Sequence, residues 1–80
     1  MVVTIYNEEG FIGEVIKVSS IVAITFFDRA ITFYLSSGNS IDFHIRPSSS
    51  FDAYIELEGK RYTPSKDDAQ RFIEHISKLL

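Results

Sequence analysis

Residues 31–45 read Ile31-Thr-Phe-Tyr-Leu-Ser-Ser-Gly-Asn-Ser-Ile-Asp-Phe-His-Ile45, and this stretch decides the fold of the chain. Apolar side chains occupy every second position on both sides of a Ser-Gly-Asn turn at 37–39, in residues 31–35 and again in residues 41–45. Period-two alternation around a Gly/Asn turn is the strongest short-range signal for a β-hairpin. We therefore predict an antiparallel sheet with one apolar face.

The rest of the chain up to residue 63 reads as further short strands. β-branched or alternating runs lie between turn signals at residues 2–6, 11–18, 21–27, 51–57 and 61–63. Gly13 interrupts the second of these runs in the manner of a β-bulge. We predict six or seven short strands in an antiparallel β-meander, which forms a strongly bent sheet or a small open barrel.

Residues 65–80 carry the clearest helical pattern. Ser65 followed by Asp68 is a capping box of the Ser-x-x-acid type. An apolar stripe recurs after it at helical spacing, through Ala69, Phe72, Ile73, Ile76 and Leu80. Because a helix of this length is not stable alone in water, the stripe must pack on the sheet. The chain is therefore predicted to be a single α+β domain over residues 1–80, with strands within 2–63 and one C-terminal α-helix at 65–80.

The composition excludes several classes of protein. The chain has 80 residues, no cysteine and a net charge of −3. Without cysteine there is no disulfide framework and no thiolate metal site, which fits a reducing compartment. No apolar run approaches the ~20 residues that span a bilayer, and the first residues lack the basic region of a secretory signal. We expect a cytoplasmic protein with no membrane segment, and small acidic domains of this kind suggest a phage or mobile-element origin.

One group of polar residues on the hairpin raises the question of catalysis. Asp42, His44 and Arg46 alternate on the outward face of one arm, with Tyr34 on the other arm, and could act as a general-base site. No obvious nucleophile accompanies them, although Ser36 and Ser37 lie near the turn, so we prefer a solvated sheet face with cross-strand polar pairs. His75 adds no ligand spacing such as His-x-x-x-His. We therefore predict a non-enzymatic protein without a metal, a cofactor or an identifiable small-molecule substrate.

The run at 21–27 carries apolar side chains on both faces, more than one helix can cover. Barrel closure would bury them, and an open sheet would leave a patch of the kind that marks association sites; both alternatives stay open. We predict a small interaction module that binds a protein partner or itself through sheet and aromatic surface. Because large outward aromatics dominate interfaces, the predicted contact residues are Phe27, Tyr34, Tyr54 and Tyr62. A homodimer would use the strand at 21–27.

A second hypothesis is a nucleic-acid-binding accessory domain. Arg46, Lys60, Arg61 and Lys66 could form a basic patch near the start of the helix, where they would contact phosphates. Tyr62 would supply a ring for base stacking. Acidic residues in the same stretch and the negative net charge favour a charge-balanced surface instead, so binding of nucleic acid is the less favoured prediction.

Overall fold

The computed structural model describes residues 1–46 and 53–80. The elements are, in chain order, β1 (Val2–Tyr6), β2 (Ile12–Lys17), the 3-10 turn η1 (Val18–Ser20), β3 (Ile21–Phe27), β4 (Ala30–Leu35), β5 (Ser40–His44), β6 (Tyr54–Leu57), β7 (Lys60–Tyr62) and α1 (Lys66–Ser77). The predicted α+β class, with seven strands and a C-terminal helix, is confirmed. The start of the run at 51–57 lies outside the described residues. No helix within the described ranges is long and apolar enough to cross a membrane.

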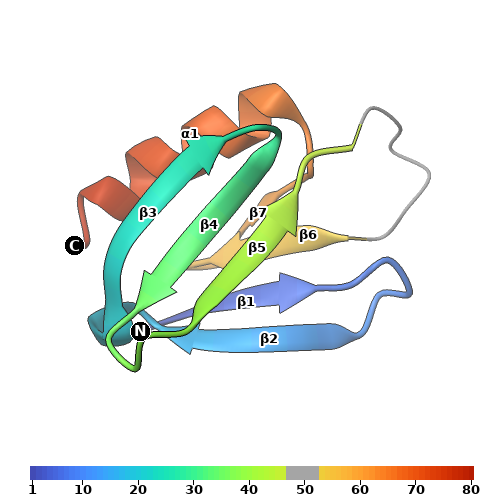
Figure 1. Cartoon of the computed structure of the whole chain (residues 1–80). Helices are drawn as coiled ribbons and strands as arrows, with labels where there is room; N and C mark the ends of the chain where they lie inside the picture. Colours follow the sequence, from blue (N-terminus) through green and yellow to red (C-terminus); the bar gives the residue numbers. More distant parts are fainter. Residues whose placement is uncertain (47–52) are drawn as a thin grey trace.

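The strands form two antiparallel sheets. Sheet A has the strand order β2-β1-β6-β7, and sheet B has the order β3-β4-β5. The meander is continuous only in sheet B, because β6 returns to pair with β1 in sheet A. Among the described strands neither sheet closes on itself, so the open alternative holds and barrel closure does not. Figure 1 shows α1 on the β3 side of the molecule and the β1–β2 hairpin on the β5 side.

The predicted hairpin is β4–β5. Ile31 pairs with Phe43 and Phe33 pairs with Ile41, so apolar residues of both arms share one face, as the alternation requires. Ile31 and Phe33 are fully buried there. Gly38 adopts a φ of 94° in the connecting turn, a value that favours glycine. Thr32, Asp42 and His44 lie on the opposite face of the hairpin, which belongs to the outer face of sheet B.

The β1–β2 hairpin contains the bulge predicted at Gly13. Ile5 pairs with Glu14 and Tyr6 pairs with Ile12, so Gly13 is the extra residue between them. A bulge increases the local twist of a strand. The bulge at Gly13 lies at the start of β2, which is an edge strand of sheet A.

The core lies between the sheets and is covered on one side by α1. Phe72 is fully buried on the helix. Its ring meets Phe33 of sheet B edge-on at 5.8 Å and Tyr62 of sheet A at 5.5 Å. The helix packs on β7 and β3, which are the edge strands of the two sheets on this side. The gap between the two sheets on this side, bordered by the edge strands β3 and β7 and covered by α1, is called the closed seam.

The helix begins as predicted and ends earlier. Ser65 is the N-cap and accepts a hydrogen bond from the Asp68 N–H at 3.2 Å. The last helical residue is Ser77, since the Lys78 and Leu79 N–H groups donate to carbonyls in the preceding turn and end the helix. Leu80 is therefore 59% exposed, and its place in the buried stripe was predicted wrongly.

Candidate functional site: the open seam

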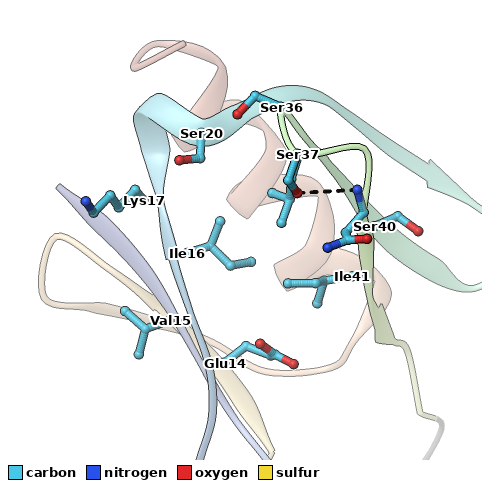
Figure 2. A pocket seen from close by; sticks show the side chains of 11 residues that line it. Glu14, Val15, Ile16, Lys17, Ser20, Ser36, Ser37, Ser40 and Ile41 are labelled. Atoms are coloured by element: carbon cyan, nitrogen blue, oxygen red, sulfur yellow. Dashed lines mark hydrogen bonds between the residues drawn. The ribbon is translucent and has the colours of Figure 1, made fainter.

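The second gap between the sheets lies between β2 and β5, the remaining two edge strands, and we call it the open seam. A groove runs along it, with Ile16, Leu35 and Ile41 as its apolar floor. Figure 2 shows Ile16 and Ile41 projecting towards each other from the two sheets. Glu14 of β2 lines one side, and serines of the β4–β5 turn line the other.

The backbone of β2 presents hydrogen-bonding groups to this groove. Val18 N–H donates to the Met1 carbonyl at 3.0 Å, and the register pairs Val3 with Ile16. Bonding to a neighbouring antiparallel strand alternates from one residue to the next. The N–H and C=O groups of Val15 and Lys17 therefore point away from β1, towards the open seam. No strand within residues 1–46 and 53–80 pairs with β2 on this side.

The edge of β5 is similar. The Ile45 N–H donates to the Arg29 carbonyl at 2.7 Å, which makes the odd-numbered residues of this arm the ones bonded to β4. The backbone groups of Ser40, Asp42 and His44 consequently face the open seam. Among the described strands, β5 pairs only with β4. The groove is thus bordered by two strand edges.

One end of the open seam is acidic. Glu8, Glu9, Glu14 and Asp42 line it together with Arg46, which forms an ion pair with Glu8. Asp42 also accepts a hydrogen bond from the Thr32 hydroxyl at 2.7 Å. The carboxylates here outnumber the guanidinium group, so the local field favours a cation.

Exposed apolar side chains adjoin the same edge. Phe11 and Ile12 at the start of β2 are 66% and 58% exposed, and Val15 is 57% exposed on the outer face of sheet A. None of these three was predicted as a contact residue. The pattern at residues 11–18 predicts a strand, but the position of this strand at a sheet edge depends on β6 pairing with β1, a contact between residues far apart in the chain.

The four predicted aromatic contact residues do not come together. Phe27 and Tyr34 lie on the outer face of sheet B. Phe27 pairs with Ala30 and Tyr34 pairs with Ala23, and the pair Thr25–Thr32 lies between these two pairs. Tyr54 lies on sheet A. Of the apolar run at 21–27, Ile24 and Phe26 pack against the core, whereas Val22 and Phe27 are exposed.

Tyr62, which is predicted as an outward contact residue, instead points into the core and is only 7% exposed. Its hydroxyl lies 2.7 Å from Nδ1 of His75, whose Nε2 lies 2.8 Å from a carboxylate oxygen of Glu58. Burial, and then the Asp68 carboxylate, raises the pKa of Tyr62, so the hydroxyl keeps its proton. The hydroxyl donates to Nδ1 and Nε2–H donates to Glu58, an assignment that satisfies every group because a carboxylate can only accept. His75 is thus a satisfied histidine that ties α1 to the β6–β7 turn.

The predicted basic patch is divided among several places. Arg46 pairs with Glu8 in the open seam, and its backbone N–H donates to the Pro64 carbonyl at 2.8 Å, so of the predicted patch it lies near Lys66 at the start of the helix. Lys60 and Lys66 lie near opposite ends of the helix. Lys66 begins the helix, and Glu58, two residues before Lys60, contacts His75 in the last turn. His75 is about 13 Å along the helix axis from Lys66.

Arg61 lies on the outer face of sheet A in an aromatic ladder. Its guanidinium carbon is 4.8 Å from the centre of the Tyr54 ring. Tyr54 also stacks on Tyr6, with ring centres 4.2 Å apart. Since β7 and β1 flank β6 on opposite sides, both faces of the Tyr54 ring are covered. Partial burial, followed by the neighbouring Tyr54 and Glu56, raises the pKa of Tyr6.

The residues considered for catalysis are spread along sheet B. Tyr34 pairs with Ser40, and His44 lies four residues further along β5. At ~3.4 Å per residue, Tyr34 and His44 are about 14 Å apart along the strand. In the described part of the chain no three His, Cys, Asp or Glu side chains are placed to hold a metal ion.

These features define a small α+β domain of two antiparallel sheets, with a helix over one seam and a groove along the other. No family model, curated protein or solved structure matches the chain. Its function must therefore be inferred from the geometry of the open seam.

Proposed function

We propose that this chain is a small non-enzymatic interaction module that binds another protein at the open seam. The observation that carries the proposal is a groove with an apolar floor between two strand edges, beside the exposed side chains of Phe11, Ile12 and Val15. Strand edges are places where another chain readily adds, and apolar surface of this kind commonly marks a protein contact.

Protein is favoured over nucleic acid as the partner. Base stacking needs a free aromatic face, and the ring of Tyr54 is covered on both sides by Tyr6 and Arg61. Phosphate binding needs cations side by side, whereas Arg46 is paired with Glu8 and Arg61 lies over the ring of Tyr54. A nucleic-acid-binding domain remains the alternative, for which fluorescence anisotropy should reveal binding at low salt that weakens steeply as salt is added.

Association of two copies through β3 is a second proposal, supported by Phe27, which is 79% exposed on its outer face. Such a dimer would be stabilised by mass action. Its melting temperature should fall on dilution, and Phe27→Glu should yield a folded monomer. A melting temperature independent of concentration would contradict the dimer.

Affinity capture tests the main proposal. A captured protein should form a complex of defined mass with the purified chain in size-exclusion chromatography with light scattering. Val15→Lys at the open seam should abolish that complex, whereas the matched change Phe27→Lys, on the other sheet, should leave it intact. Loss of binding with Phe27→Lys and not with Val15→Lys would place the partner elsewhere and contradict the proposal.

A further inference from the structure

We propose that the open seam receives an extended segment of another protein, which adds to sheet A as an antiparallel strand beside β2. This inference rests on the proposed function and specifies its partner. The backbone groups of Val15 and Lys17 supply the hydrogen bonds, because they point to the seam and no described strand pairs with them. Antiparallel addition matches every strand pairing in the described parts of both sheets and is slightly more stable per residue than parallel pairing.

The residues of β2 define the sequence that fits beside it. Residues directly opposite each other in a sheet project from the same face. Ile16 faces the apolar floor of the groove and Glu14 its acidic end, whereas Val15 and Lys17 project from the outer face. Read along an antiparallel partner from the position opposite Lys17, the matching order is acidic, apolar, β-branched, basic. The last of these residues would meet Glu14 and the neighbouring carboxylates.

A second copy of β2 does not supply this order. In a two-fold antiparallel pairing, residues of the inner face lie opposite residues of the inner face. Glu14 pairs with inward Ile5, and Lys17 pairs with outward Val2, so the two charges project from opposite faces. Glu14 would therefore never meet Lys17 of the other copy. Charge complementarity selects a different chain.

The backbone contact is tested with the synthetic peptide Thr-Glu-Ile-Val-Lys-Thr, titrated into the whole 15N-labelled chain and followed by NMR. The peptide should slow hydrogen exchange of the Val15 and Lys17 amides by about tenfold or more, which reports new hydrogen bonds. The amide of Ile16, already bonded to β1, should change little. Val15→Pro should abolish binding, because it removes one seam-facing N–H and none that bonds to β1.

Charge selection is tested with a second peptide in which glutamate replaces the lysine. The parent chain should prefer the lysine peptide, and Glu14→Lys should reverse that preference. The matched variant Glu74→Lys, on the exposed face of α1, should not.

Several results would overturn strand addition: no exchange protection at millimolar peptide, peptide contacts on the outer face of sheet B, or protection of the same amides by self-association. A captured partner that binds the Val15→Pro variant as tightly as the parent would also overturn it, but would leave the interaction module standing. Failure to capture any partner would count against the module itself.

Discussion

The two seams between the sheets differ in what covers them. At the closed seam, α1 packs over the edges of β3 and β7 and buries Phe72 completely. At the open seam, the edges of β2 and β5 border a groove whose floor is only partly covered, because Leu35 and Ile41 are half-buried. Both seams arise from the same pair of sheets, so the difference comes from the single α-helix of the described residues covering one of the two gaps.

Polar contacts follow the same division. The closed seam holds the hydrogen-bonded chain from Tyr62 through His75 to Glu58, which links α1 to sheet A. The open seam holds carboxylates and backbone edges that face solvent in this chain. The side-chain link between the helix and a sheet therefore lies at the closed seam.

Removal of the Phe72 ring should have the largest effect. Phe72→Ala should lower the free energy of unfolding by about 3–5 kcal/mol, because the ring fills the closed seam and contacts both sheets. Phe11→Ala, just before β2, should lower it by less than about 1 kcal/mol because its ring is 66% exposed. Urea denaturation followed by circular dichroism measures both. Equal losses would show that the two seams do not differ in their contribution to stability.

The polar link should contribute less than the ring. Tyr62→Phe leaves His75 Nδ1 without its partner at a largely buried site, so we expect a loss of about 1–2 kcal/mol. Tyr34→Phe removes the same hydroxyl from a tyrosine that is 43% exposed and should change stability by no more than ~0.5 kcal/mol. Thermal denaturation of both variants makes the comparison. If Tyr62→Phe is neutral, the link is not a structural tie.

The elements of the fold were predictable because their signals are local. Alternation around Gly38 gave the β4–β5 hairpin, and the spacing of Phe72 and Ile76 gave the face of the helix that is buried. The bulge at Gly13 was also readable, since glycine within a strand pattern has few other causes. Each of these inferences needs only neighbours in the sequence.

The division into two sheets and the candidate site were not predictable in this way. The open seam exists because β6 pairs with β1, some fifty residues away, which leaves β2 at an edge. Tyr62 was expected outside because large aromatic side chains on outward positions dominate interfaces. The structure turns Tyr62 inward, opposite Ile55, where its hydroxyl finds His75. Such placements depend on tertiary contacts that period and propensity do not contain.

Acid should weaken the closed seam through Asp68. Partial burial alone would raise its pKa, but hydrogen bonds from the Thr63 N–H and hydroxyl, with Arg71 beside it, hold that pKa below its ordinary value. A lowered pKa stabilises the fold above the ordinary value of 3.8, and this stabilisation is lost as the pH falls through the folded-state pKa. Asp68→Asn should therefore lower stability by about 1 kcal/mol near neutral pH, and by progressively less below 3.8.

The matched control for this pH dependence is Asp67→Asn, one residue earlier in the same first turn of the helix and exposed. It should shift stability by no more than ~0.5 kcal/mol and leave the acid dependence of the parent intact. Urea denaturation at a series of pH values measures both variants. An acid limb that is unchanged in Asp68→Asn would show that Asp68 does not link proton binding to folding.

The smallest expected effect lies at the open seam. Val15→Thr keeps a β-branched side chain on β2 and exchanges a methyl for a hydroxyl at a position that is 57% exposed. Because no buried contact is lost, the free energy of unfolding should change by no more than ~0.5 kcal/mol. Ile16→Thr, the next residue and 3% exposed, places a hydroxyl in the buried floor and should destabilise the chain by about 1–3 kcal/mol. Urea denaturation of the two variants compares the faces of one strand. A loss of more than about 2 kcal/mol in Val15→Thr would mean that the outer side of β2 is already covered, and the seam would then not be open to a partner.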